Sequence, residues 1–507
     1  MSVLDNAPTV DAPARLPRLE WFGPAAQWDG EVPTLRLLID GEWREASGGQ
    51  TFAVRTPIDG GLLAHAQRAT ADDVEAAIGA AVRTQGDWGA TPAAQRIGVC
   101  EAAAELVEER IDAIAEAITL DLGKTREGAH SEGDATAQRL AMVREEVRKI
   151  TGEYLGGDWI PDTAGKQAIV LREPVGTVAA IGPFNYPLFL SASKIIPAIA
   201  AGNTVVAKAP SDDPVPLALF ARILQDAGLP PGVLNVITGS GREIGDLFAT
   251  HPAIGMVSFT GSSDVGSRIS KISGPKRLHL ELGGNAAGIV LDDAALDEAA
   301  TATVKGAYKS AGQRCDAISR VLVDRAVYDG YVDRVVKEAQ TWTLGDPRAH
   351  ETKVGPLVSP HAAERVHSLV QDALSKGAEL LLGGDVEGAY HEPTVLAGVP
   401  LNADIVWEEH FGPVLPVLAV DGLDEALEIA NRSRYGLDSA VFTGSLTRAF
   451  RAAHGLQCGM VTINDAPAHG VGHFPFGGRK PDSGIGREGL GYSIDECTEL
   501  KTIVLPA

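Results

Sequence analysis

The sequence predicts an α/β protein with two tandem Rossmann-like α/β domains and a small β extension. From Gly176 onward, β-branched runs of strand length recur, namely GTVAAIG, NTVVAKA, GVLNVIT and MVSFT, with helical stretches such as PLALFARILQDAG between them. This alternation is typical of a parallel sheet wrapped by helices. A second series starts near residue 288 with GIVLDDA and continues to SAVFTG. Two such series in one chain indicate two α/β domains.

Length and charge limit the classes of protein. The chain has 507 residues, of which 45% are hydrophobic and 22% charged, so it can bury two cores and is not mostly disordered. Its formal charge is 44 − 67 = −23. Such a surface repels nucleic-acid phosphates and anionic lipids, and we expect neither partner. The most apolar stretch, 177–207, contains Asn185, Pro187 and Lys194, which is unlike a membrane span.

The cysteines favour a cytoplasmic protein without a structural metal. Cys100, Cys315, Cys458 and Cys497 are widely separated, and no CxxC pair is present. This spacing predicts neither a disulfide framework nor a zinc cluster, so we expect no metal site and a reducing compartment. The first residues also lack the basic start and apolar run of a secretory signal.

The N-terminal third has its own pattern. Residues 1–33 are rich in Ala, Pro and Asp and are predicted to form an extended arm. The segment LLIDGEWREA predicts a hairpin that turns at Asp40-Gly41. From residue 71 to 125 the apolar period is helical, and one face is predicted to carry Val74, Ala77, Ile78, Ala81 and Val82.

Cys315, in the segment GQRC, is the strongest candidate nucleophile. An isolated cysteine is more often a small core residue. Cys315 differs because a glycine lies just before it and Arg314 and Asp316 flank it. A free thiol is only slightly ionised at neutral pH, and we expect a nearby guanidinium, such as that of the adjacent Arg314, or backbone dipoles to favour the thiolate.

Two further segments carry chemistry. Glu281 in LELGGN should lie near the end of a strand. It is either a solvated terminal charge or a partly desolvated carboxylate with a raised pKa, which would suit a general base. Asn185 in GPFNYP follows a strand and is either a turn residue or, with the backbone N–H of Cys315, a donor to a developing oxyanion.

Taken together, the motifs resemble the aldehyde dehydrogenase superfamily from about residue 35 to 503. The matching segments, in the family's order, are GPFNYP, NTVVAKA, FTGSSDVG, LELGG, GQRC, EEHFGPV, PFGG, SGIGREG and TELKT. The resemblance implies oxidation of an aldehyde to its carboxylic acid with NAD(P), through a thiohemiacetal and a thioester on Cys315. Glu281 would be the base for hydrolysis, Asn185 part of the oxyanion hole, and Lys194 a supporting residue.

We expect a homodimer or homotetramer, since exposed strands outside a core often pair with another subunit. The resemblance also implies the domain organisation. The expected parts are an N-terminal arm at 1–33, a cofactor-binding domain at 34–150 and 175–285, a catalytic domain at 286–480, and oligomerisation segments at 151–174 and 488–507.

The expected cofactor site does not follow GxGxxG, because Gly245 lies one residue too far from the GSG at 239–241. The resemblance instead places the pyrophosphate at the helix after FTGS, where free N–H groups suit an anion. NAD-preferring relatives often carry Glu where Ser211 stands, so NADP is preferred and NAD stays possible, with Asp212 and Asp213 weakening the case. The predicted cofactor residues are Lys208, Ser211, Gly241, Gly245, Phe259, Gly261, Ser262, Gly266, Leu282, Glu409 and Phe411.

The substrate prediction is a short polar aldehyde. Ser193 stands where other relatives carry Trp or Arg, and the chain is similar to the non-phosphorylating, NADP-dependent glyceraldehyde-3-phosphate dehydrogenase group. By that likeness Tyr186 and Arg314 would contact a phosphate, with Arg139 substituting for an arginine expected at Ala135.

One segment departs from that group. The segment before PFGG reads Ala466-Pro467-Ala468-His469 and lacks the group's arginine. His469 becomes the candidate substrate residue there, and an uncharged hydroxyaldehyde becomes a rival to glyceraldehyde 3-phosphate. A semialdehyde or broad-range enzyme and a catalytically silent binding or structural member remain as alternatives, whereas Glu281 disfavours CoA acylation.

Overall fold

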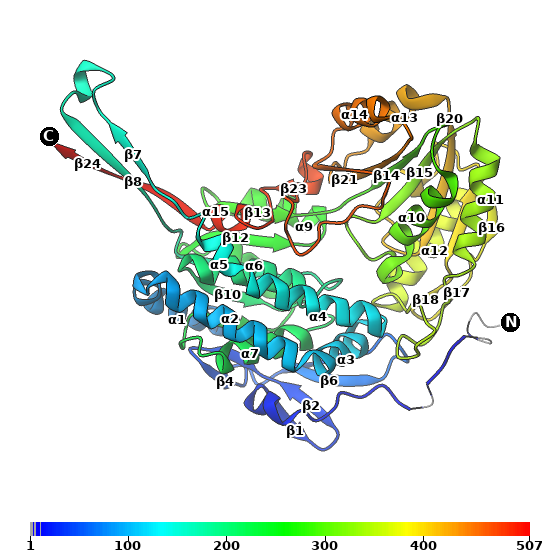
Figure 1. Ribbon diagram of the computed structural model, residues 1–507. Helices are drawn as coiled ribbons and strands as arrows, with labels where there is room; N and C mark the ends of the chain where they lie inside the picture. Colours follow the sequence, from blue (N-terminus) through cyan, green and yellow to red (C-terminus); the bar gives the residue numbers. More distant parts are fainter. Residues whose placement is uncertain (1–3, 5–6, 11, 507) are drawn as a thin grey trace.

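The computed structural model describes residues 4, 7–10 and 12–506 and contains two large α/β sheets and a projecting three-stranded sheet (Figure 1). The predicted fold class, two Rossmann-like α/β units with a small β extension, is confirmed. In the described part of the chain, no helix is long and apolar enough to cross a membrane.

The first large sheet has eight strands, of which the five from β13 to β11 are parallel. After β9, the chain adds β10 and β11 on one side of β9 and then β12 and β13 on the other side. The strand order therefore reverses between β9 and β12. Ligands of such sheets bind outside the carboxyl ends of the strands at this reversal. In spatial order the strands are β23 (Gly484–Ile485), β13 (Arg277–Glu281), β12 (Ile254–Thr260), β9 (Thr177–Ile181), β10 (Thr204–Lys208), β11 (Leu234–Ile237), β3 (Leu37–Ile39) and β4 (Glu42–Arg44).

Alternating residues of these strands enter two separate apolar clusters. In β9, Val178 and Ala180 lie in one cluster and Ala179 and Ile181 in the other, as expected for a strand buried on both faces. One face is covered by α1 (Ala71–Ala90), α8 (Gly241–Thr250) and α9 (Ser263–Ile272). The other is covered by α2 (Ala93–Glu109), α3 (Ile111–Leu122), α4 (Arg126–Ala141), α5 (Val143–Val147), α6 (Phe189–Ala201), α7 (Val215–Asp226) and α15 (Tyr492–Glu496).

The predicted apolar face of α1 is largely confirmed. Val74, Ala77, Ile78 and Ala81 are buried in the core, but Val82 is 44% exposed, so its assignment to that face is wrong. The helical period places Val82 beyond the edge of the stripe that meets the sheet. The hairpin at Asp40-Gly41 is confirmed by the antiparallel pairing of β3 with β4.

The second large sheet has seven strands and a separate core. Its strands in spatial order are β16 (Glu379–Leu382), β19 (Thr394–Ala397), β20 (Val414–Val420), β15 (Ile318–Asp324), β14 (Ala286–Val290), β21 (Asp438–Phe442) and β22 (Met460–Ile463). Around it lie α10 (Leu296–Tyr308), α11 (Tyr328–Ala339), α12 (Pro360–Ser375), α13 (Gly422–Arg432), α14 (Leu446–Gly455), the short helices η3 (Lys309–Gly312) and η4 (Asp404–Val406), and the pair β17 (Val386–Glu387) and β18 (Tyr390–His391).

The C-terminal strand and the segment after α5 form the projecting sheet. β24 (Thr498–Pro506) pairs with β8 (Lys166–Pro174), which pairs with β7 (Glu153–Gly156) and is preceded by η2 (Pro161–Thr163). These strands extend away from the body in Figure 1. Residues 488–497, which we expected to be part of the extension, instead include α15, whose Ile494 is buried against α6.

The expected extended arm is only partly extended. Among the described residues before 20 the chain is irregular, and the carbonyl of Pro8 accepts from Asp346 N of the second domain at 2.9 Å. Residues 1–3, 5–6 and 11 of the predicted arm lie outside the described residues. Residues 20–33, however, contain η1 (Glu20–Ala25) and β1 (Ala26–Asp29), and they enter β2 (Val32–Leu35). These strands join β6 (Leu62–Gln67) and β5 (Thr51–Arg55) in a four-stranded sheet, and Phe22 and Ala25 of the arm are buried with Leu35 in one apolar cluster.

A short connection joins the last parallel strand of the first large sheet to the second large sheet, and the chain returns to the first sheet between β22 and β23. β13 ends at Glu281 and β14 begins at Ala286. The carboxyl ends of the first sheet's strands therefore face the amino ends of the second sheet's strands. The junction between the two sheets is therefore lined from both sides. The first sheet contributes the loops that follow β9 and β12, and the second sheet contributes the loops that precede β15 and β20 and the start of β21.

Candidate active site

Cys315 lies at the end of a tightly wound turn. Ser310, Ala311 and Gly312 all have positive φ, at 56°, 54° and 73°. A Cβ at Gly312 would clash with the backbone carbonyl of Gly412, so only glycine fits there. This turn brings the partly exposed Cys315 to the start of β15, at the junction between the sheets.

The LELGG segment passes directly beside the nucleophile. A Cβ at Gly284 would clash with the carbonyl oxygen of Cys315, so the two backbones are in contact. Glu281 ends β13, as predicted, and its side chain is 2% exposed. The solvated-charge interpretation of Glu281 is therefore wrong, because its carboxyl is buried near Lys194, Arg487 and Glu488.

Asn185 also reaches this point from the first sheet. It follows β9, is buried, and donates from Nδ2 to the carbonyl of Gln313 at 2.8 Å. The neighbouring Phe184 ring meets the Phe411 ring edge to face at 5.7 Å. Loops after β9 and β13 and loops before β15 and β20 thus converge, and they bring together the three residues Asn185, Glu281 and Cys315.

The electrostatic expectation for the nucleophile was wrong. The pKa of the Cys315 thiol is raised well above its usual value, first by burial and then by nearby carboxylates, of which Asp316 and Asp438 act most strongly. Arg314 does not offset this, because its Nη2 lies 2.6 Å from Oδ2 of Asp316. A guanidinium next in sequence cannot favour the thiolate when a carboxylate already neutralises it.

A buried cluster of two acids and two bases lies beside Cys315. His469 Nε2 is 3.2 Å from Asp316 Oδ2 and 3.6 Å from Asp438 Oδ2. Arg314 also donates to the carbonyl of Pro467 at 3.1 Å. Burial raises the pKa of Asp438 to about 7, whereas Arg314 and His469 hold the pKa of Asp316 far below its usual range against burial. The two candidate substrate residues, Arg314 and His469, are thus both engaged by carboxylates.

The environment of Glu281 favours its neutral form. Burial, and then the nearby Glu488, raise its pKa well above the usual value, while Lys194 and Arg487 oppose this. Lys194 is buried on α6 with its Nζ 3.5 Å from Oε2 of Glu488. Lys194 therefore acts on Glu281 as part of a buried ion pair.

The segment after β12 leads directly into the start of α9 and packs closely against its neighbours. Ser262 is the N-cap of α9 and its side chain makes no capping bond, which leaves the first N–H groups of the helix free for an anion. A Cβ at Gly266 would clash with Leu282, and one at Gly261 would clash with the ring of Phe259. These five predicted cofactor residues therefore line one wall of the crevice at the strand-order reversal.

Lys208 and Ser211 lie together at the carboxyl end of β10. Lys208 Nζ is 2.9 Å from the carbonyl of Ala209 and 3.4 Å from Ser211 Oγ, and Ser211 donates to Gly239 O. A Cβ at Gly241, the first residue of α8, would lie 3.7 Å from Lys208 Cε, and one at Gly245 would meet nothing within 4 Å. Burial lowers the pKa of Lys208 to about 8.

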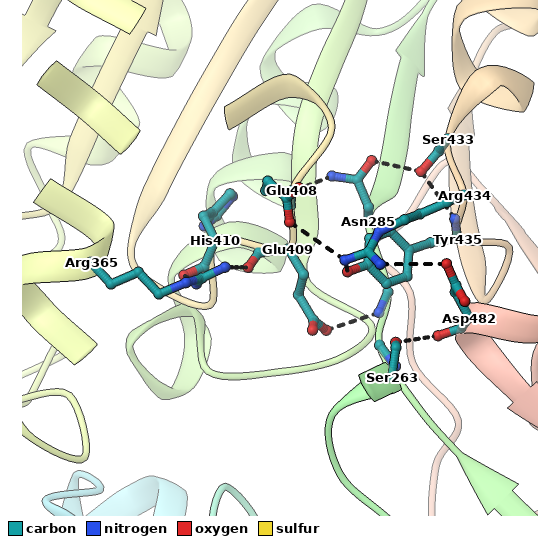
Figure 2. A network of polar contacts seen from close by, with 12 residues as sticks. Ser263, Asn285, Arg365, Glu408, Glu409, His410, Ser433, Arg434, Tyr435 and Asp482 are labelled. Carbon is teal, nitrogen blue, oxygen red and sulfur yellow. Dashed lines mark hydrogen bonds and ion pairs between the residues drawn. The ribbon is translucent and has the colours of Figure 1, made fainter. Parts of the chain in front are cut away.

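Figure 2 shows the network at the other end of the crevice. Glu409 accepts from the backbone amide of Gly284 at 2.8 Å, and burial raises its pKa to about 7. Arg434 lies 3.5 Å from both Glu408 and Asp482. The carbonyl of Asp482 in turn accepts from Ser263 on α9, so η5 (Pro481–Ser483) connects both domains.

The remaining predicted substrate residues are also engaged. Tyr186 Oη lies 3.2 Å from Ser310 Oγ, and Lys124 Nζ lies 3.6 Å from the centre of the Tyr186 ring. Lys124 is ion-paired with Glu132. Arg139 is 1% exposed and pairs with Glu146 at 3.0 Å, so its position favours a structural role over phosphate binding.

Sequence patterns did not single out several residues that the fold brings here. Asp438 starts β21, Glu488 follows β23, and His279 lies two residues before Glu281. Of these three residues, only His279 could have been predicted from the sequence to lie beside Glu281, because residues two apart on a strand share a face. Within the described part of the chain, no group of three or more His, Cys, Asp or Glu could hold a metal ion.

The fold and this crevice define a two-domain pyridine-nucleotide-dependent dehydrogenase with a cysteine at the domain junction. The chain belongs to the aldehyde dehydrogenase family, whose model matches residues 43–503.

Named relatives agree with this membership. The chain is 38% identical to an NADP-dependent glyceraldehyde-3-phosphate dehydrogenase of Streptococcus equinus, over 92% of this chain and 97% of that protein. It is 38% identical to a vanillin dehydrogenase of Corynebacterium glutamicum, over 92% and 96%. A crystal structure of an NADP-dependent glyceraldehyde-3-phosphate dehydrogenase from Bacillus halodurans C-125, complexed with NADP, matches with a TM-score of 0.91 and 37% identity, covering 93% of this chain and 99% of that one.

Proposed function

We propose that this enzyme oxidises a short, uncharged hydroxyaldehyde to its carboxylic acid, with NADP as the preferred cofactor. The convergence of Asn185, Glu281 and Cys315 at the domain junction carries this proposal. Aldehyde oxidation by a thiol needs a nucleophile, a donor for the oxyanion and a base for water, and these three side chains are of those types.

In the proposed reaction, Cys315 Sγ adds to the aldehyde carbon and forms a thiohemiacetal. The oxygen that becomes negative is stabilised by the Cys315 backbone N–H and by Asn185, whose amide has a second hydrogen besides the one given to Gln313. The cofactor, when bound, supplies the hydride acceptor. Glu281 then takes a proton from the water that attacks the thioester, and the acid leaves Cys315.

The crevice fits an NADP molecule. Lys208 is a buried cation whose hydrogen-bond acceptors are a carbonyl and the Ser211 hydroxyl, which suits a 2′-phosphate. The free amides at the start of α9, from Ser262, suit the pyrophosphate. Glu409 would hold the nicotinamide ribose, and Phe411 would contact the ring. NAD remains a possible second cofactor.

Charge pairing favours an uncharged substrate over a phosphate ester. The cations considered for phosphate binding, Arg314 and Arg139, pair with Asp316 and Glu146, and Lys124 pairs with Glu132. A buried, paired guanidinium gains little from a second anion. Hydroxyl groups, in contrast, can donate to Asp316 or Asp438, since Asp438 has no hydrogen-bond donor of its own among the described residues.

Glyceraldehyde 3-phosphate is the second candidate, because Asp438 and Asp316 raise the pKa of His469 against burial and so favour its protonated form near Cys315. A panel of glyceraldehyde, lactaldehyde, glyceraldehyde 3-phosphate and succinic semialdehyde, each with NADP and with NAD, separates the candidates by the absorbance of reduced nicotinamide. The proposal fails if glyceraldehyde 3-phosphate has a kcat/KM above that of every uncharged aldehyde.

We also propose that the enzyme is a cytoplasmic homodimer or homotetramer assembled through the projecting sheet. β24 is exposed at every residue after Thr498, which is unfavourable for a strand that carries apolar side chains in a monomer. Its exposed apolar residues, with those of the two adjoining strands and their connection, include Tyr154, Trp159, Ile160, Leu500, Ile503 and Val504. Sedimentation of the protein and of a variant truncated before residue 498 tests this assembly.

A further inference from the structure

A second histidine lies beside the proposed base. His279 precedes Glu281 by two residues on β13, so both side chains project from the same face of the sheet. His279 Nε2 is 3.6 Å from Oε1 of Glu281. The exposed fractions of the two residues are 3% and 2%, so water does not compete for this contact.

The polar atoms of this pair have no other partner in the described part of the chain. Neither carboxyl oxygen of Glu281 makes a hydrogen bond, and neither does Nδ1 of His279. A buried polar group without a partner costs about 1–3 kcal/mol. A small rotation of the Glu281 carboxyl would close the 3.6 Å gap to Nε2 of His279 and give one Glu281 oxygen a partner.

The charged groups around His279 come from every element packed against it. Lys194 lies on α6, Arg487 and Glu488 follow β23, and Glu496 lies on α15. Burial, and then Lys194, lower the pKa of His279 to about 4. The imidazole is therefore neutral at physiological pH and carries one proton, which either ring nitrogen can hold.

Gly486 leaves space on the outer side of the imidazole. It has φ 94°, and a Cβ there would lie 2.9 Å from Nδ1 of His279 and 3.3 Å from Oε1 of Glu496. The ring can therefore present a protonated Nε2 to an ionised Glu281 or an unprotonated Nε2 to the carboxylic acid, without a steric conflict at Nδ1.

We propose that His279 is a positioning residue for the general base: Nε2 holds the Glu281 carboxyl in the crevice and, as an N–H donor, favours its ionised form during thioester hydrolysis. This inference rests on the proposed function. In that step Glu281 removes one proton from water, the hydroxide oxygen bonds to the acyl carbon, and the carbon–sulfur bond to Cys315 breaks. His279 undergoes no net protonation or deprotonation.

Three substitutions separate positioning from packing. The amide of glutamine reaches the place of Nε2, whereas that of asparagine reaches only the place of Nδ1. His279→Gln should therefore preserve the interaction with Glu281. His279→Asn keeps a polar side chain but loses the interaction, and His279→Leu loses both.

A chromogenic nitrophenyl acetate provides an assay without cofactor. Its ester acylates Cys315 with release of nitrophenolate, so the burst reports acylation and the steady rate reports hydrolysis of the acyl-enzyme. Loss of the donor raises the pKa of Glu281, and activity that needs the carboxylate then disappears at a higher pH. We expect the acid limb of the steady rate to move up by about one pH unit in His279→Leu and His279→Asn, which is about a tenfold loss on that limb.

The burst should be unchanged in all three variants, and His279→Gln should keep the wild-type acid limb. His391→Leu is the matched control, since His391 is also buried with its pKa lowered to about 4 but lies on β18. It should lower the melting temperature and leave the acid limb unchanged.

The inference is overturned if His279→Leu keeps the wild-type acid limb, or if the glutamine and asparagine variants behave alike. Glu281→Gln distinguishes this from failure of the proposed function. If Glu281→Gln hydrolyses the acyl-enzyme at the wild-type rate, the role of Glu281 itself is wrong, and the inference about His279 falls with it.

Discussion

The backbone amide of Gly284 donates to Oε1 of Glu409 at 2.8 Å, and this bond joins the segment leaving the first sheet to the loop that enters β20. The relationship places a titratable carboxyl beside the connection on which Glu281 lies. Since Gly284 also touches the backbone of Cys315, a change at Glu409 can reach the nucleophile through one short segment.

Cofactor binding should weaken as Glu409 is protonated. Burial raises the pKa of Glu409 to about 7. Glu409 is therefore fully ionised, and able to accept hydrogen bonds from a ribose as a carboxylate, only above that pH. We expect the KM for NADP to rise as the pH falls from 8 to 6, measured at saturating aldehyde.

Glu409→Gln should raise the KM at pH 8 by about tenfold and abolish this pH dependence, because an amide does not titrate and accepts less strongly than a carboxylate. A Glu409→Gln enzyme with an unchanged pH dependence would assign the titration to another group.

The choice between NADP and NAD should depend on Lys208 and Ser211. Ser211→Glu places a carboxylate where a 2′-phosphate would bind, and we expect kcat/KM for NADP to fall at least about tenfold while that for NAD is kept or improved. Isothermal titration of both dinucleotides checks the binding part of this effect.

Lys208 should give NADP binding a pH dependence opposite in direction to that given by Glu409. Its pKa is lowered to about 8 by burial, so the cation is present below that pH and is lost above it. The kcat/KM for NADP should therefore decline above pH 8 relative to that for NAD. Lys208→Met should remove this difference, and equal decline for both dinucleotides would contradict the assignment.

Asp316→Asn should increase the use of phosphorylated substrates. Removal of the negative charge leaves Arg314 without its carboxylate partner beside Cys315, while His469 still faces Asp438, and this favours an anionic substrate group. We expect the ratio of kcat/KM for glyceraldehyde 3-phosphate to that for glyceraldehyde to rise at least about tenfold.

The same substitution should lower the pKa of the Cys315 thiol, because Asp316 is the carboxylate that raises it most. The pH dependence of alkylation by iodoacetamide measures that pKa. Asp438→Asn serves as the comparison, and it should lower the thiol pKa without giving a comparable gain for the phosphorylated aldehyde.

Cys315→Ala and Glu281→Gln should interrupt different steps. The first removes the nucleophile and should lower kcat by about 10,000-fold while NADP binding is kept. The second should leave a full burst of reduced cofactor and lower the steady rate by about 100- to 10,000-fold. Rapid mixing with glyceraldehyde separates these outcomes, and a missing burst in Glu281→Gln would place Glu281 before hydride transfer.

The alternation of strands and helices and the ordered motifs determined the fold class and the family without any coordinates. Those features are local: a β-branched run such as 177–181 is a strand by its own composition. The same local character explains why residues 20–33 were wrongly predicted to be an extended arm, because their short strands belong to a sheet that is completed by β6, a distant segment.

Only the tertiary structure decided the electrostatics of the site. Sequence adjacency indicated that Arg314 would favour the thiolate, but Asp316, His469 and Asp438 together determine the field at Cys315. A charge acts through distance and burial, and neither can be read along the chain. The sequence therefore identified the reacting groups, and the packing of the two domains determined which of their charges are already paired.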